Sequence, residues 1–258
     1  MSDQNNSTPN VQSLKSLLSG SGISQNSQSI IIDNLQGNNQ VLAGAGGTPI
    51  GQLLEDDVTV VTLIVDMSSS MAMHEKGVID GFNQMLKAIR DSKLEDSVLM
   101  SLWTFNQQPN LVFDNRPIAN VPDLNDRSYV PNGSTALYDT ALNGMTGNIS
   151  YVTDLRNNGV TARGIVIVIS DGEDNESSAT PAKLKSVAQD MVNQEIFTLA
   201  FFAFGFHGEP VAKSMGFESI LETGKTEHEM REALNTVSKS IIRNSQTQIS
   251  ASGTNFFN

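Results

Sequence analysis

The sequence contains no cysteine, which excludes disulfide bonds and every metal site built on thiolates. It also lacks any run of about 18 or more apolar residues, the length that a membrane-spanning helix needs. The first ten residues, MSDQNNSTPN, have neither the basic start nor the apolar stretch of a secretory signal. We therefore expect a cytoplasmic protein with no membrane contact, and export by a route without an N-terminal signal stays open.

Basic residues are scarce. The 16 Lys and Arg residues stand against 28 Asp and Glu residues, which gives a net charge of −12, and no basic run occurs. A chain this acidic repels a phosphate backbone, so we expect no nucleic acid among its partners.

Apolar residues are also few, at 38% of the chain, and the shortage is greatest in residues 1–56. This segment is rich in Asn, Gln, Ser and Gly, and such a composition buries too little apolar surface to offset the entropy of ordering. Val11, Leu14, Leu17 and Leu18 nevertheless recur at helical spacing and favour a short amphipathic helix. We expect a segment that is largely disordered or that docks on a partner, including a second copy of the chain.

After this segment, apolar runs rich in β-branched residues alternate with helical stripes. Solid apolar runs are typical of strands that are covered on both faces, and their alternation with helices indicates a parallel sheet. We predict an α/β fold with a doubly wound, mostly parallel sheet, helices on both faces and one short antiparallel edge strand. The domain spans 57–244, a polar tail spans 245–258, and the predicted strands cover 58–66, 97–105, 111–113, 163–170, 196–204 and 219–221.

Acidic and hydroxyl side chains follow the ends of these strands. Asp66 ends the first apolar run, and Ser68 and Ser70 follow at alternate positions within IVDMSSSM. Asp171 follows the fourth run within SDGEDN, and Thr135 lies between them, just before a predicted helix. In a doubly wound sheet, ligands bind at the carboxyl ends of strands where the strand order reverses. If the first and fourth strands are neighbours, these five side chains face one crevice.

The chemistry of this set favours a hard cation. Two close carboxylates repel each other, and one of them takes a proton unless a cation lies between them. All donor atoms are oxygens, which suits Mg²⁺, Mn²⁺ or Ca²⁺ and argues against zinc or copper. Because hydroxyl ligands carry no charge, a cation held here keeps positive charge that the Asp or Glu of a partner can neutralise.

The five residues resemble the metal-ion-dependent adhesion site of the von Willebrand factor A domain family. The family pattern is D-x-S-x-S, then a threonine, then an aspartate before glycine; DMSSS, GSTALYD and SDGED match it in order. The resemblance covers about residues 57–243 and implies a Rossmann-like fold. It also implies that Ser68, Ser70 and Thr135 bind the metal directly and that Asp66 and Asp171 bind it directly or through water. One coordination position is then left for a carboxylate of the partner. Many members carry glycine where this chain has Ser69.

By this resemblance the chain is a metal-dependent protein–protein interaction module, an intracellular scaffold or adaptor. It is similar to bacterial members that work beside ATPases. We assign no catalytic residue, because the serines lack a G-x-S-x-G context and no orienting histidine is identified. Two alternatives stay open: a metal-dependent phosphohydrolase that uses the same crevice, and a self-assembling structural protein with an empty site.

Two other features have structural interpretations. The stretch GAGGTPIG at 44–51 precedes the first strand instead of following one, which favours a linker over a phosphate-binding loop. His74 and Glu75 follow the serines, and we expect them at the solvated start of a helix.

Overall fold

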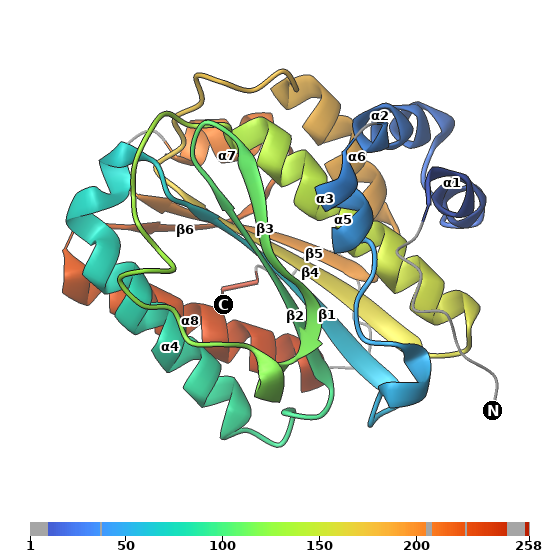
Figure 1. Cartoon of the computed structure of the whole chain (residues 1–258), viewed down its shortest axis with the longest axis horizontal. Helices are drawn as coiled ribbons and strands as arrows, with labels where there is room; N and C mark the ends of the chain where they lie inside the picture. The colour runs from blue at the N-terminus through green and yellow to red at the C-terminus, as the bar shows by residue number, and fades with distance from the viewer. Residues whose placement is uncertain (1–9, 37, 205–207, 225, 247–255, 258) are drawn as a thin grey trace.

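The protein is built around a single six-stranded sheet with the order β3-β2-β1-β4-β5-β6 (Figure 1). Neighbouring strands pair in parallel, except that β3 runs antiparallel to β2. The computed structural model describes residues 10–36, 38–204, 208–224, 226–246 and 256–257. The strands are β1 Asp57–Asp66, β2 Val98–Phe105, β3 Pro109–Pro117, β4 Thr161–Ser170, β5 Phe197–Phe204 and β6 Ser219–Thr223. The predicted doubly wound α/β fold is confirmed.

Helices cover both faces of this sheet, as Figure 1 shows. One face carries α4 and α8, which pack against each other, and the opposite face carries α5 in the centre with α6 and α7 beside it. Their bounds are α4 Glu75–Arg90, α5 Leu137–Asn157, α6 Pro181–Asn193, α7 Gly208–Ser214 and α8 Glu227–Gln246. No helix in the described ranges combines the length and the apolar character needed to cross a membrane.

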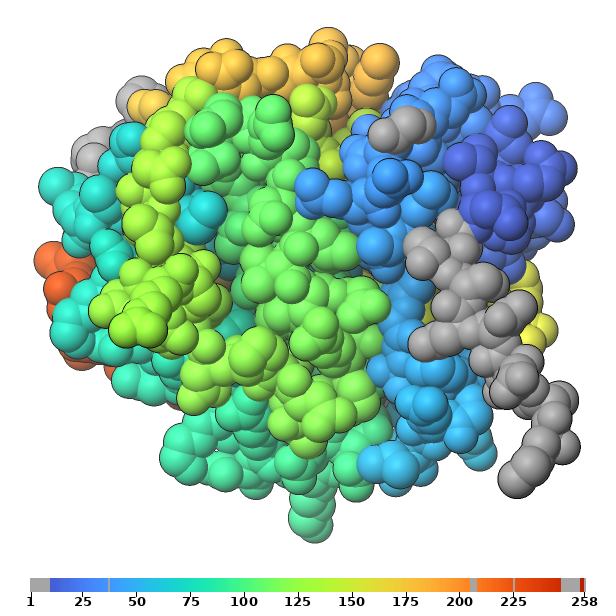
Figure 2. All heavy atoms as spheres, in the orientation of Figure 1, coloured from blue at the N-terminus to red at the C-terminus, as the bar shows by residue number. Residues whose placement is uncertain are grey.

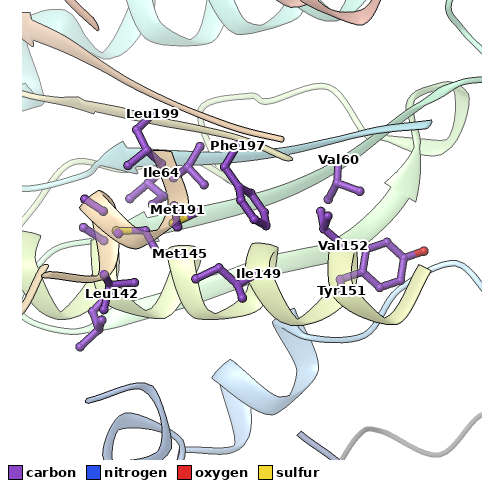
Figure 3. Close-up of a cluster of buried hydrophobic side chains, with 14 of the residues drawn as sticks. Val60, Ile64, Leu142, Met145, Ile149, Tyr151, Val152, Met191, Phe197 and Leu199 are labelled. Carbon is purple, nitrogen blue, oxygen red and sulfur yellow. The ribbon is translucent and has the colours of Figure 1, made fainter. Parts of the chain in front are cut away.

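The alternation of side chains along β1 divides the core into two layers. Val60 and Ile64 point to the layer with α5, whereas Val61, Leu63 and Val65 point to the layer with α4 and α8. Both sets are buried because successive side chains of a strand point to opposite faces and both faces are covered. Figure 3 shows part of the first layer, with side chains from β1, β5, α5 and α6 in contact.

The edge strand β3 is antiparallel, as predicted, but it is nine residues long. Its apolar core, 111–113, is only part of it, because the flanking positions include exposed polar residues such as Asn110 and Arg116. The pairing with β2 also contains register shifts. An irregular, half-exposed strand of this kind has no continuous apolar run, and the sequence pattern therefore predicted too short a strand.

The N-terminal segment forms three helices, α1 Val11–Ser19, α2 Gln25–Leu35 and α3 Asn39–Gly44. The predicted amphipathic helix is α1, in which Leu14 and Leu18 are fully buried. Ile31, Leu35 and Val41 join them in the core layer of α5. For residues 10–36 and 38–56 this differs from the expected disorder, because a few well-spaced apolar side chains find partners on α5 and α6 that composition does not reveal.

Polar side chains of this segment also find specific partners on the domain. The Ser24 hydroxyl donates to Asp190 Oδ2 at 2.5 Å, and Asn26 Nδ2 donates to Ser186 Oγ at 2.8 Å, both on α6. Burial acts to raise the pKa of the Asp190 carboxyl group, but the hydrogen bonds from Ser24 and Ser27 outweigh it, so that the pKa of Asp190 is lowered. Ser and Asn residues, which favour disorder by composition, here join α2 to α6.

The glycine-rich stretch at 44–51 lets α3 approach its neighbours closely. A Cβ atom on Gly44 would lie 2.7 Å from the Trp103 ring, and one on Gly147 of α5 would lie 2.7 Å from the Gly44 carbonyl oxygen. Gly47 forms a bridge with Asn115 of β3. The prediction that residues 44–51 form a linker is therefore incomplete, because part of this stretch is packed between α5 and the edge of the sheet.

At the other end of the chain, Phe256 is buried in the layer of α4 and α8. Its amide donates to Ser219 Oγ at 3.0 Å, and the Arg243 guanidinium donates to its carbonyl oxygen. Most of the predicted polar tail, residues 247–255, lies outside the described residues.

Replacement of Gly147 by valine tests the contact between α3 and α5. We expect the free energy of unfolding to fall by about 1–3 kcal/mol, because the new side chain meets backbone that has no free space to move into. Urea unfolding followed by circular dichroism measures the change. The control is Gly51→Ala, whose Cβ would meet no atom within 4 Å; a Gly147→Val protein as stable as this control would show that α3 does not pack here.

Candidate metal site

The five predicted site residues face one crevice only if the first and fourth strands are neighbours. This condition is met, because β1 and β4 pair in the centre of the sheet, with Val65 opposite Ile169. Asp66, the last residue of β1, therefore lies beside Ser170, the last residue of β4, and Asp171 follows immediately. From β1 the chain continues outward to β2 on one side, and β5 lies beyond β4 on the other. This is the point where the strand order reverses, and both carboxylates lie at it.

Asp66 is fully buried and held by hydrogen bonds at both carboxylate oxygens. The Ser68 amide donates to Oδ1 at 2.8 Å, and the Ser170 hydroxyl donates to Oδ2 at 2.7 Å. Burial raises the pKa of Asp66 to about 6, and the charge of Asp171 adds to the increase, whereas the hydrogen bonds from Ser68 and Ser170 oppose it. The charged form of the Asp66 carboxylate is therefore unfavourable here, because it is shielded from water.

The two serine hydroxyls lie together just after the end of β1. Ser68 is the residue before the 3₁₀ helix η2 Ser69–His74, and its Oγ is 3.0 Å from Oγ of Ser70. Ser68 is buried and Ser70 is exposed. The pair therefore extends from the buried carboxylate to the solvent.

Ser69, the departure from the family pattern, fits this turn without strain. In the described part of the chain, Glu195 is the only residue other than glycine with a positive φ. The backbone of Ser69 therefore adopts no conformation that requires glycine. Its amide donates to the Gly133 carbonyl oxygen at 3.0 Å, which fixes the turn.

The loop before α5 is fixed by hydrogen bonds against residues 67–70, which follow β1 and which we call the serine loop. The Asn132 amide donates to the Met67 carbonyl oxygen at 2.9 Å, next to the bond between Ser69 and Gly133. Three residues after Asn132, Thr135 is buried, and its amide donates to Asn175 Oδ1 at 2.8 Å in the loop after β4. Backbone bonds hold Thr135 between the loops that carry the two aspartates.

The structure thus brings the predicted residues to one end of the sheet. Asp66, Ser68 and Ser70 form a continuous hydrogen-bonded chain, Asp171 is joined to it through Ser170, and Thr135 is joined through the loop contacts. Figure 2 shows the loops around 65–75, 125–135 and 170–180 meeting at the upper left of the molecule.

The donor chemistry fits a hard divalent cation. All donors are carboxylate or hydroxyl oxygens, and no ion pair in the described residues involves Asp66 or Asp171. The described part of the chain also contains no cluster of three or more His, Cys, Asp or Glu side chains suited to a metal. A centre built on histidine or on many carboxylates is therefore not present in this part, whereas two carboxylates supplemented by hydroxyls match Mg²⁺, Mn²⁺ or Ca²⁺.

Sequence reasoning did not identify three residues that support the site. Ser170 binds Asp66 directly, the Tyr129 hydroxyl donates to the Asp66 carbonyl oxygen at 2.5 Å, and Asn175 holds Thr135. Only Ser170 carries a signal in the sequence, because it precedes Asp171 at the end of a predicted strand. The other two come from loops whose paths the pattern does not predict.

His74 also differs from its prediction. It is buried instead of solvated, and its ring stacks on Phe204 at the end of β5, with the ring centroids 5.8 Å apart. The ring extends the core below the serine loop. The polarity of its sequence neighbours, Glu75 and Lys76, concealed this burial.

No family model and no curated protein matches the sequence. Solved structures with a similar fold are the pilus adhesin SpaC from Lactobacillus rhamnosus GG, the PilB minor pilin from Streptococcus sanguinis, and the vWF domain of the type V pili tip protein Mfa5 from Porphyromonas gingivalis. Their TM-scores are 0.53, 0.53 and 0.52, at 13%, 11% and 10% identity.

The similarity covers 73–74% of this chain, and 30% of SpaC, 63% of PilB and 97% of the Mfa5 domain. The chain therefore matches less than two thirds of SpaC and PilB but nearly all of the Mfa5 domain. At these identities the likeness establishes the fold alone: an α/β fold similar to that of the Mfa5 vWF domain.

The raised pKa of Asp66 predicts how stability depends on pH without metal. Folding raises this pKa from 3.8 to about 6, so protonation favours the folded state. The stabilisation is complete below about pH 4 and is lost as the pH rises through about 6, a change of about 3 kcal/mol. Urea unfolding in EDTA at pH 4 and pH 7 should show this loss in the wild type but not in Asp66→Asn. Identical pH profiles for the two proteins would contradict the burial of an ionisable carboxylate.

Proposed function

We propose that the chain is a metal-dependent protein–protein interaction module. The observation that supports it best is the fully buried Asp66 carboxylate beside Asp171, with hydroxyl donors and no basic side chain of the described residues paired to it. An acid in such a place needs positive charge, because burial of an unpaired carboxylate is costly. A divalent cation supplies that charge and also accepts the neighbouring hydroxyl oxygens.

The ligands that we propose are Asp66, Ser68, Ser70, Thr135 and Asp171. When bound, the cation supplies a Lewis-acidic position that takes a carboxylate from a partner protein. Asp66 and its hydrogen bonds to Ser68 and Ser170 hold the buried side of the site in place. The exposed Ser70 leaves the solvent side accessible to that carboxylate.

The same residues support binding better than turnover. Hydrolysis needs a general base within hydrogen-bond reach of the attacking group. The serine hydroxyls are paired with each other, and the nearest histidine in the sequence, His74, is buried against Phe204. Within the described residues we therefore assign no catalytic group, and no specific observation favours the phosphohydrolase alternative.

We further propose an intracellular scaffold or adaptor, with an acidic residue of an ATPase-associated complex as the captured group. This rests on the resemblance of GSTALYD to intracellular bacterial members. The similar folds belong to a pilus adhesin, a minor pilin and a pilus tip protein, and the two settings differ in location. Fractionation of the native host followed by immunodetection tests it, and recovery of the protein outside the cytoplasm would reject the intracellular role.

Binding of metal by the purified chain is the direct test. Isothermal titration calorimetry with MgCl₂ and MnCl₂ should show one site per chain in the wild type. Asp66→Ala and Asp171→Ala should weaken it at least about tenfold, since each loses a charged ligand worth more than about 1.4 kcal/mol. The matched control is Asp96→Asn, an exposed carboxylate before β2.

Partner capture should respond in the same way. Proteins retained from host lysate by the immobilised wild type in MgCl₂ should be released by EDTA and not retained by Asp66→Ala. Circular dichroism establishes that each variant is folded. Retention that ignores both chelation and substitution would refute the proposal.

A further inference from the structure

Among the residues that the structure describes, three large apolar side chains are exposed, and two of them are on the loops beside the proposed metal site. In the described residues these are Leu54, Met73 and Val130, with 71%, 72% and 47% of their surface exposed. Met73 is in η2, three residues after Ser70. A single exposed apolar residue needs no explanation, but two on adjoining site loops indicate a binding surface.

Hydrogen bonds connect the loops that carry these two residues. The Tyr129 hydroxyl donates to the Asp66 carbonyl oxygen, and Val130 is the next residue along the loop. The Asn132 amide donates to the Met67 carbonyl oxygen at 2.9 Å, and the Ser69 amide donates to the Gly133 carbonyl oxygen at 3.0 Å, so the loop of Val130 lies against the segment that leads into η2. Met73 and Val130 are therefore exposed apolar residues on two loops that are bonded to each other beside the site. We call these two residues the apolar rim.

The third exposed apolar residue is followed directly by acids. Leu54 precedes Glu55 and Asp56, which are both exposed, and neither carboxylate makes an ion pair or hydrogen bond with the described residues. The next acid, Asp57, is instead bound by Arg163 at 3.0 and 3.1 Å. Leu54, Glu55 and Asp56, which we call the acidic turn, thus combine available carboxylates with an apolar side chain.

The acidic turn and the metal site lie at opposite ends of β1. The turn immediately precedes Asp57, and the strand ends at Asp66. Ten residues of strand span about 30 Å. In Figures 1 and 2 the turn, in light blue, lies at the lower right, far from the site loops at the upper left. Because β1 is the paired centre of the sheet, the two features of one molecule cannot meet.

We propose that the acidic turn of a second copy of this chain binds at the metal site. A carboxylate of Glu55 or Asp56 completes the coordination, and Leu54 packs on the apolar rim. This inference rests on the proposed function and names one partner for it. The chemistry is complementary on both counts: anion with cation, and apolar with apolar.

The contact is head-to-tail, so a pair of copies keeps one unused site on one molecule and one unused turn on the other. Heterologous contacts of this kind extend into open chains unless the rotation between copies closes a ring. The net charge of −12 per copy opposes association. Assembly therefore depends on the divalent cation, and moderate salt, which screens the repulsion between copies, does not abolish it.

Sedimentation velocity of the full chain tests the proposal. In MgCl₂ the weight-average sedimentation coefficient should rise with protein concentration, and EDTA should return the sample to monomer. The double variant Glu55→Gln/Asp56→Asn and the variant Met73→Ser should each lose at least about tenfold in association constant. Asp96→Asn, an exposed acid at the same end of the sheet, is the matched control and should assemble as the wild type does.

A mixing experiment identifies the head-to-tail arrangement. Asp171→Ala lacks a working site but keeps its turn, whereas Glu55→Gln/Asp56→Asn keeps its site but lacks its turn. Each variant alone should remain monomeric in MgCl₂, and an equimolar mixture should form dimers and no larger species. Monomers only, or assembly of either variant alone, would overturn the arrangement.

Calorimetry separates failure of this inference from failure of the proposed function. A wild type that binds Mg²⁺ but stays monomeric leaves the metal site in place and overturns self-assembly, so that the rim serves a different protein. A wild type that binds no divalent cation overturns both. Assembly that persists in EDTA overturns the metal-bridged contact alone.

Discussion

The structure around the site depends on one unfavourable interaction, the burial of the Asp66 carboxylate at the carboxyl end of the central strand. Its two oxygens accept hydrogen bonds from Ser68 and Ser170, yet burial still raises its pKa to about 6. Hydrogen bonds thus reduce the cost of the charge without removing it. The donors to the carboxylate come from the loop after β1 and from the end of β4, and backbone hydrogen bonds tie the loop before α5 to the loops on both sides of it.

The second constraint is the depth at which α5 is buried. The sheet covers one side of it, and α1, α2 and α3 cover the other, so that even its polar residues are enclosed. Asn148 donates to the Val60 carbonyl oxygen and to Thr62 Oγ1, and Asn143 accepts from Asn34 of α2. The helix that begins just after Thr135 is therefore fixed along its whole length. The N-terminal helices contribute to the site through this support and not by contact with it.

The similar solved structures share this architecture at 10–13% identity. One fold hosts many functions, so the shared sheet does not transfer adhesion to this chain. What the chain itself contributes is a net negative charge, a group of oxygen donors at the strand ends, two exposed apolar residues on the adjoining loops and an acidic turn at the far end of the sheet. The proposed partner chemistry is inferred from these features and not from the fold.

The sequence by itself determined the central strands, the helices between them and the residues at the strand ends, because these follow from short-range patterns of apolar side chains and from one motif. It did not determine the packing of the N-terminal helices. That packing depends on pairs distant in sequence, such as Gly44 with Gly147 and Ser24 with Asp190. The burial of His74 and the support from Tyr129 likewise arise only when loops meet across the sheet. Tertiary structure decided these features because their energy lies in contacts between segments that no local pattern places together.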